Sequence, residues 1–561
     1  MRRLSPRASL YCCGLSLAVL AAAAGCSGNT EGPTGTGGSS ATGNAGTTGS
    51  AGTTGSAGTT GNAGTTGNAG TTGNAGTTGS AGTTGAAGSI STAGTTGTAG
   101  VSGTAGTTGT AGRGGTTGRG GVSGTAGTTG SGGSASCTFT QSSAVSTMIA
   151  SVATVTWSTT LANATSAKID FGLTTSYGMS APVAAVTTSN KTMLLGMKYA
   201  KMYHYRITAM SSSGSCQSDD YTVMTGALPT GLQKPTITTT NAAALAGGFL
   251  VTGQYTMNAG SGSPAYILDA DGDYVWAFTT PNDVTGAIMD YAGTHMWINS
   301  ANVPSTMGAH VRRVAMDGST NEDLSSQFTG ANHQLTVLPD ETVAFYAYGS
   351  NGCDDIKERS TSGTVKTVVN SKTAHGGTGA CHINNIQYSP DDQTLVFSDL
   401  DNNVLTKVTR TGTVVWVLNG VGAPGITNGF TGDTWVGGEH GIHVLGVDKL
   451  LIFNNNSRAP GGATTTMPGT NDGSLALEIK LDLTAKKAMK TWMYKGSGTS
   501  YQNDVMGDVQ RLANGNTIVA FSTKGIIVEV DAAGTVLQTL RTQSNFGYIH
   551  KRPTLYGPSP R

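Results

Sequence analysis

The strongest constraint on the fold is an internal repeat that runs through residues 235–561. One half of the repeat is an apolar strand, a tight turn with Gly or an equivalent residue, and a second strand that often ends in Trp. Six copies occupy residues 265–276, 311–318, 355–365, 405–416, 476–492 and 527–536. The spacing is about 54 residues per copy, the size of a four-stranded blade with its loops. This repeat predicts a six-bladed β-propeller.

The other half of each repeat contains the strand that should lie nearest the propeller axis. In three consecutive copies this strand begins with a histidine, namely His333, His382 and His440. Strand packing gives no reason for His to recur at one position, whereas a shared pocket does. We therefore expect the three imidazoles to converge at the mouth of the central funnel. The alternative is that each His only caps the beginning of its strand.

Three convergent imidazoles allow two kinds of chemistry. They could bind zinc with an open fourth position, and Glu439 beside His440 keeps that interpretation open. Alternatively, one neutral imidazole attacks an electrophile while its neighbours move protons and neutralise developing charge. This second arrangement, with one nucleophilic imidazole and two neighbours that move protons and neutralise charge, suits the transfer of an anionic group.

The order of motifs around these histidines resembles the arylsulfotransferase family of exported bacterial enzymes. His382-x-Asn384 is followed by Tyr388 and Asp391-Asp392, and further matching stretches lie at 451–456 and 507–516. The resemblance covers roughly residues 240–541. It implies a six-bladed propeller that moves a sulfuryl group from a phenolic sulfate ester to a phenol. It also implies no cofactor, no metal and no nucleotide sulfate donor (a PAPS-independent enzyme).

The resemblance carries roles over to individual residues. His440 matches the nucleophile that becomes transiently sulfated, and His333 matches a helper on an earlier blade. His382 and Asn384 match residues that hold the sulfate oxygens. These assignments predict ping-pong chemistry, in which a neighbouring imidazole deprotonates the second phenol.

This chain departs from the family pattern at two places. The family has Arg two residues after the serine that corresponds to Ser398, where this chain has Leu400. The family's tandem His reads Asn332-His333 here. A missing guanidinium removes an always-charged anchor for sulfate, and Arg458 or Arg312 are the candidates to replace it.

The first 25 residues have the features of an export signal. A basic segment precedes an apolar run that ends in small residues before Cys26, the pattern of a bacterial lipoprotein signal. We expect Cys26 to carry a lipid and to anchor an exported protein to the cell envelope at the outer membrane. The alternative is an ordinary signal peptide with an incidental Cys.

Two further segments precede the propeller. Residues 26–136 are a Gly/Thr/Ala-rich low-complexity stalk, in which Gly falls on every third residue from Gly43 to Gly133 except at Ser91. With so few apolar side chains, we expect a disordered spacer rather than a triple helix. Residues 137–232 show short alternating runs with an early Trp157, which predicts a fibronectin type III-like β-sandwich.

Cysteine count and charge complete the expectations. After removal of the signal and lipidation of Cys26, an even number of cysteines predicts disulfides, with Cys137 bound to Cys216 and Cys353 bound to Cys381. A net charge of +1 gives no argument for nucleic acid, and the membrane contact would be the lipid anchor alone. The resemblance implies that the partners are small molecules, an aryl sulfate and a phenol. The competing functions are a lipid-anchored binding propeller and a zinc-dependent ester hydrolase.

Overall fold

The computed structural model describes residues 137–557, apart from 257–261, 303–305, 350, 424, 428, 436, 459–472 and 497. Its regular structure is almost entirely antiparallel β-sheet, and α2, Ser371–His375, is the only α-helix among these residues. The predicted all-β fold is therefore confirmed. No helix in the described part of the chain is long and apolar enough to cross a membrane. The predicted signal, the lipidation site Cys26 and the stalk lie outside the described residues.

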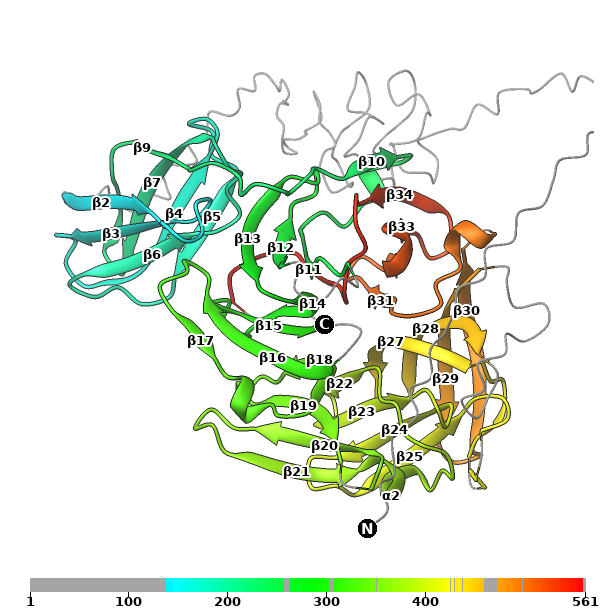
Figure 1. The fold of residues 1–561 in the computed structure, drawn as a ribbon. Helices are drawn as coiled ribbons and strands as arrows, with labels where there is room; N and C mark the ends of the chain where they lie inside the picture. Colours follow the sequence, from blue (N-terminus) through cyan, green and yellow to red (C-terminus); the bar gives the residue numbers. More distant parts are fainter. Residues whose placement is uncertain are drawn as a thin grey trace, which may run out of the picture. The chain divides into compact units, whose positions relative to one another are not determined.

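The first folded part is a β-sandwich of two sheets (cyan in Figure 1). One sheet has the order β2-β3-β6, and in the other β5-β4-β7 is extended by β8 and β9, which both pair with β7. Alternate residues of β3 and β4 are buried, and Trp157, Ile169 and Tyr205 meet in one core. The predicted disulfide between Cys137 and Cys216 is present. The strands are β2 (Phe139–Val145), β3 (Ala153–Thr159), β4 (Ala164–Gly172), β5 (Met179–Val183), β6 (Asn190–Leu194), β7 (Met202–Ser211), β8 (Gly214–Gln217) and β9 (Tyr221–Met224).

Six further sheets are arranged around a common centre and form the predicted propeller (Figure 1). Four of the blades are built from consecutive strands, with the first strand of each innermost. The second blade contains β14 (Asp283–Met289), β15 (His295–Asn302), β16 (Thr306–Ala315) and β17 (Asn321–Asp323), and the third contains β18 (Ala331–Val337), β19 (Val343–Tyr348), β20 (Asp354–Arg359) and β21 (Val365–Asn370). The fourth contains β22 (Ile386–Ser389), β23 (Thr394–Asp399), β24 (Val404–Thr409) and β25 (Val414–Asn419). The fifth contains β27 (Gly437–Gly446), β28 (Lys449–Arg458), β29 (Leu475–Asp482) and β30 (Lys487–Lys495), with β26 (Thr431–Gly432) added in parallel to β30.

The first and last blades close the ring by sharing strands from distant parts of the chain. In the first blade, β35 from the C-terminal end pairs with β11 and supplies the innermost strand. In the last blade, β10 pairs with β34 as a fifth, outermost strand. The first blade contains β35 (His550–Arg552), β11 (Phe249–Gly253), β12 (Ser263–Leu268) and β13 (Tyr274–Thr280), and the last contains β31 (Asp508–Arg511), β32 (Thr517–Phe521), β33 (Ile526–Val530), β34 (Val536–Arg541) and β10 (Thr236–Thr239).

The predicted repeat is the outer hairpin of each blade. Its turn needs one residue with a positive φ, a conformation that Gly adopts without steric cost. Five of the six hairpins place Gly there, and Lys486 takes the left-handed position in the fifth blade with φ 54°. The five glycines are Gly272, Gly318, Gly363, Gly412 and Gly534. This shared requirement is why the repeat is visible in the sequence.

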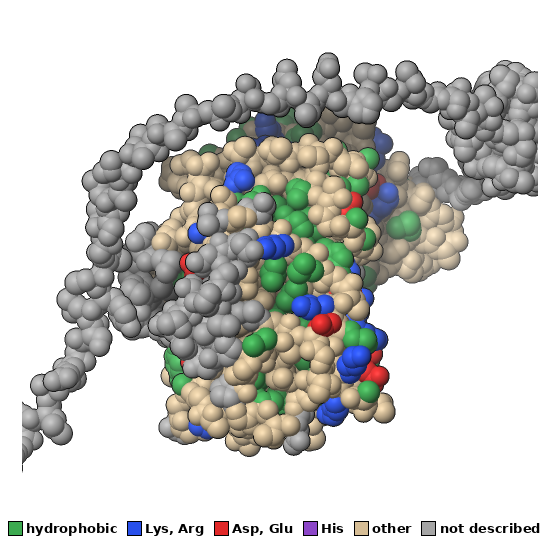
Figure 2. Space-filling view, turned by 90° about the vertical axis from the view of Figure 1, so that its right-hand side faces the viewer, with side chains coloured by type: hydrophobic (Ala, Val, Ile, Leu, Met, Phe, Trp, Pro, Cys, Tyr) green, Lys and Arg blue, Asp and Glu red, His purple; other side chains and the backbone are tan. Residues whose placement is uncertain are grey.

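Charged residues make up only 11% of the chain. On the face seen in Figure 2, Lys and Arg are scattered rather than gathered into a patch.

Candidate active site

The inner strands of three neighbouring blades bring the predicted histidines together. His333 lies on β18, His440 lies on β27, and His382 lies just before β22. The ring centre of His333 is 5.3 Å from that of His382 and 6.2 Å from that of His440. The imidazole of His333 therefore lies next to both of the others, as the shared-pocket hypothesis requires.

The prediction that each inner strand begins with its histidine is wrong, because β18 begins at Ala331, β27 begins at Gly437, and the strand that follows His382 begins later. β22 begins at Ile386 rather than at His382. The backbone N–H groups of His382 and Ile383 donate to the carboxylates of Asp399 (3.1 Å) and Asp354 (2.9 Å) instead of to a neighbouring strand. The residue thus lies on a short irregular segment that leads into the strand.

The hydrogen bonds of His440 assign its tautomer. Its Nδ1 lies 2.7 Å from the side-chain Oδ1 of Asn455, on β28. The amide nitrogen of Asn455 donates to the carbonyl oxygens of Asn503 (2.6 Å) and Met506 (2.8 Å), so Oδ1 is the acceptor. His440 Nδ1 must therefore carry the proton, which puts the lone pair of the neutral ring on Nε2.

His333 is held in a similar way but on a strained backbone. Its Nδ1 donates to Oδ1 of Asn332, whose amide nitrogen in turn donates to the hydroxyl of Tyr348 at 3.0 Å. The backbone of His333 has φ 38°, which is uncommon for a residue with a side chain and costs free energy. Burial, followed by the charges of His382 and His440, holds its pKa well below 6.5. His333 is therefore neutral at pH 7 and able to accept a proton.

The position of the family arginine is occupied by a buried apolar side chain. Leu400 is only 6% exposed, and its N–H donates to the carbonyl oxygen of His382 at 2.9 Å. Arg312 pairs with Asp323 at 2.8 Å on the outer strands of the second blade, so it does not replace the missing charge. Arg458 is the last residue of β28, and its side chain lies outside the described part of the structure.

Asn384 forms a bridge between two blades. It is fully buried, and its amide nitrogen donates to the carbonyl oxygen of Glu439 at 2.7 Å. That carbonyl belongs to the residue before His440, so Asn384 supports the backbone of His440. The carboxyl of Glu439 is itself fully buried, and burial raises its pKa to about 8. It is therefore largely protonated at pH 7.

The described residues contain two groups of side chains close enough to share a metal ion, and neither contains the three histidines. In the first group, Cys381 is bound to Cys353 in the second predicted disulfide. The other group, Asp269, Asp271 and Asp273, surrounds the ammonium of Lys198 at 3.2, 2.8 and 2.7 Å. This geometry gives no support to the zinc interpretation.

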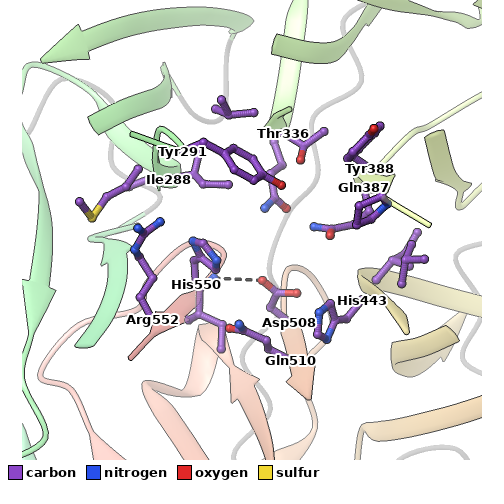
Figure 3. A pocket seen from close by; sticks show the side chains of 18 of the residues that line it. Ile288, Tyr291, Thr336, Gln387, Tyr388, His443, Asp508, Gln510, His550 and Arg552 are labelled. Carbon is purple, nitrogen blue, oxygen red and sulfur yellow. Dashed lines mark hydrogen bonds between the residues drawn. The ribbon is translucent and has the colours of Figure 1, made fainter. Parts of the chain in front are cut away.

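A separate cavity of about 270 Å³ lies further along the inner strands (Figure 3). All six blades line it, but the three predicted histidines do not. Figure 3 shows Asp508 between His443 and His550. Burial raises the pKa of Asp508 to about 7, and burial with the charges of Arg552 and His443 lowers that of His550 to about 3. A Cβ on Gly441 would lie 2.3 Å from Oδ1 of Asp508, so this cavity wall directly supports the strand of His440.

Sequence reasoning missed the residues that hold the imidazoles. Asp399 and His375 lie in no stretch that the sequence singled out, and Asn455 lies in the matching stretch 451–456 without an assigned role. The available signal was position, because Asp399 ends the largely apolar strand β23 and Asn455 lies in the run of three asparagines that follows the apolar half of β28. A buried polar side chain needs hydrogen-bond partners, so such a place points to a network.

The arylsulfotransferase (ASST) family model matches residues 355–546, which include His382, Asn384 and His440. A search of curated proteins finds no match. Among solved structures, the chain is similar to TolB from Acinetobacter baumannii, with 12% identity over 64% of this chain and 80% of that one and a TM-score of 0.36. It is also similar to a protein of unknown function from Bacteroides thetaiotaomicron, with 12% identity, 72% and 98% coverage and a TM-score of 0.32. These two likenesses are weak, and the propeller assignment rests on the strand pairing. The family predicted from the motifs is confirmed over residues 355–546, and the chain carries an arylsulfotransferase-family domain.

Proposed function

We propose that the protein is an aryl sulfotransferase that moves a sulfuryl group from a phenolic sulfate ester to a phenol through a sulfohistidine at His440. The family match supports aryl sulfotransferase activity in general, with aryl sulfates and phenols as substrates. The observation that carries the finer proposal is the tautomer of His440. Asn455 holds the proton on Nδ1, so the Nε2 lone pair is the nucleophile.

The reaction proceeds in two displacements. In the first, Nε2 of His440 forms a bond to sulfur while the bond from sulfur to the phenolic oxygen breaks, and the phenolate leaves with the electron pair. In the second, the oxygen of the acceptor phenol attacks the sulfur, the S–N bond breaks, and Nε2 recovers its lone pair. His333, protonated while the sulfate ester is bound, gives the proton on Nε2 to the departing phenolate in the first displacement, and its then neutral Nε2 accepts the acceptor's proton in the second.

The anion is neutralised by imidazoles in this proposal. Leu400 cannot supply the positive charge of the family arginine, so His382 and His333 carry that role when the sulfate ester binds. An approaching anion favours the protonated form of a nearby imidazole, which opposes the effect of burial. The amide nitrogen of Asn384 supports the backbone of Glu439 and His440, and its assignment as a residue that holds a sulfate oxygen stays a prediction.

The decisive experiment compares His440→Ala with His443→Ala, a histidine on the same strand that lines the separate cavity. His440→Ala should abolish sulfuryl transfer from a chromogenic aryl sulfate to added phenol, whereas His443→Ala should retain it. Wild-type protein incubated with the donor alone should gain one sulfuryl group on the peptide that contains His440. Absence of transfer by wild-type protein, with or without divalent metal, would refute the proposal.

One observation favours a second candidate, a binding propeller without catalysis. The buried Leu400 stands where the family has an always-charged anchor. In that case the domain would bind aryl sulfates, as measured by calorimetry, yet form no sulfohistidine.

We also infer that the protein is exported and anchored to the cell envelope through a lipid on Cys26. The two disulfides support an oxidising compartment. Metabolic labelling with a radioactive fatty acid tests this inference, because Cys26→Ala should lose the label and release the protein from membranes. Retention of the label in that variant would contradict it.

A further inference from the structure

A fully buried pair, His375 and Asp399, lies directly behind His382. Nε2 of His375 is 2.9 Å from Oδ2 of Asp399, and both side chains have no exposed surface. The N–H of Gly377 donates to Nδ1 of His375 at 2.9 Å, so the proton of the neutral ring is on Nε2 and is donated to Asp399.

Asp399 accepts hydrogen bonds through both of its oxygens. Oδ2 accepts from His375 and from the amide nitrogen of Asn402 at 3.0 Å. Oδ1 accepts from the backbone N–H groups of His382 (3.1 Å), Asp401 (3.1 Å) and Asn402 (3.2 Å). Such a set of donors compensates for burying a carboxylate and leaves it little freedom to move.

The same short segment is held at each of three consecutive residues. Cys381 is bound to Cys353, the N–H of His382 donates to Asp399, and the N–H of Ile383 donates to Asp354 at 2.9 Å. The carbonyl oxygen of His382 also accepts from the N–H of Leu400. His382 is therefore fixed through both of its backbone polar groups, although it lies outside any strand.

We propose that the His375–Asp399 pair is a positioning device that sets the place of the His382 imidazole against His333. This inference rests on the proposed function for its kinetic consequence. Its structural consequence does not, because the accessibility of His382 can be measured without any substrate. Asp399 directly precedes Leu400, the position at which the family has its arginine. In this chain the same segment therefore holds the backbone of His382.

Asp399→Asn tests the proposal in the full chain. An Asn side chain can accept only through one oxygen, so its amide nitrogen would face a donor from His375 or from the backbone. With aryl sulfate as substrate we expect kcat/KM to fall by about 100-fold, the scale of a misplaced catalytic group. The KM for the donor should rise while the KM for phenol stays constant. A loss of folded protein alone would lower apparent kcat and leave both KM values unchanged.

The substrate-independent readout is the rate at which diethyl pyrocarbonate modifies His382, measured by peptide mass spectrometry. Asp399→Asn should increase this rate several-fold without a matching change at His443. The control is Glu358→Gln, which alters a buried carboxylate paired with Arg410 and Lys366 elsewhere in the third blade. Glu358→Gln should leave the modification rate of His382 unchanged.

Failure of the proposal and failure of the proposed function give different results. If wild-type protein has no transfer activity but Asp399→Asn still exposes His382, only the reaction is wrong. If Asp399→Asn leaves the modification rate of His382 unchanged, or Glu358→Gln raises it equally, the positioning role is overturned. Should Asp399→Asn fail to fold, His375→Leu removes one donor to Asp399 and should give a smaller change in the same direction.

Discussion

Asn455 accepts a hydrogen bond from His440 across two adjacent strands of the fifth blade, with 2.7 Å between Oδ1 and Nδ1. Both side chains are buried, and Asn455 is itself fixed by two backbone carbonyls in the loop before β31. The orientation of one amide therefore decides which nitrogen of the imidazole can attack. This relationship gives the first prediction.

Asn455→Leu should lower kcat for sulfuryl transfer by about 100-fold, because the ring loses the partner that fixes its tautomer and orientation. Steady-state kinetics with a chromogenic aryl sulfate measure the change. Asn516→Leu is the matched control, since Asn516 is a buried asparagine that bonds Glu529 and the carbonyl of Ala244 far from His440. An equal loss in both variants would show that the effect is general destabilisation.

Gly441→Ala should displace the strand that carries His440, because the added Cβ would collide with Asp508. A Cβ at this position would lie 2.5 Å from the Cα of Asp508, and backbone atoms cannot move aside cheaply. We expect a loss of about 2 kcal/mol in stability and a lower kcat, because the change is next to His440. On the same strand, a Cβ at Gly446 would meet its nearest atom only at 3.9 Å. Thermal unfolding and kinetics should therefore separate Gly441→Ala from a nearly silent Gly446→Ala.

Asp508 makes stability depend on pH. Burial raises its pKa to about 7, so the folded protein keeps this carboxyl protonated at a pH where the unfolded chain has released the proton. The resulting stability is fully present below the ordinary pKa of about 4 and is lost as the pH rises through 7. Between those limits, wild-type protein should lose about 4 kcal/mol relative to Asp508→Asn. Urea unfolding at both ends of the range measures the difference, and a constant difference would contradict the buried, neutral carboxyl.

The two disulfides should differ in their effect on activity. Replacing Cys353 and Cys381 by Ser opens a loop of sequence separation 28 and frees the segment that holds His382, so transfer should fall sharply. Replacing Cys137 and Cys216 opens a longer loop of separation 79 in the sandwich and should leave kcat unchanged. Loop-closure entropy predicts about 3–4 kcal/mol for the first pair and about 4–5 kcal/mol for the second. The variant with the larger loss of stability should thus keep the higher activity, and the reverse order would contradict this account.

The fold was largely predictable because its constraints are local and repeated. Each outer hairpin needs one left-handed turn residue, and Gly at 272, 318, 363, 412 and 534 makes that need visible. The convergence of His333, His382 and His440 was predictable for the same reason, since the inner strands of successive blades and the segments that lead into them meet at the axis. The family prediction followed from the order of motifs and is confirmed over residues 355–546.

The supporting network was not predictable, because its contacts join residues far apart in the chain without any period. Asn503 and Met506, which lie 48 and 51 residues further along the chain, fix the amide of Asn455. Asn384 matched a residue that holds sulfate, yet its amide nitrogen bonds the carbonyl of Glu439, 55 residues further on. Such contacts depend on which loops the folded ring brings together, and a single sequence contains no pattern that records them.

The position of β35 determines when the propeller can close during folding. Its residues 550–552 provide the axial strand of the blade that also contains β11, β12 and β13. Until the chain has been synthesised to that point, the first blade lacks its inner strand and the circle stays open. Because contacts over nearly the whole domain must form at this step, closure should be the slow event of folding. The propeller would thus be complete only after its last segment has docked against β11.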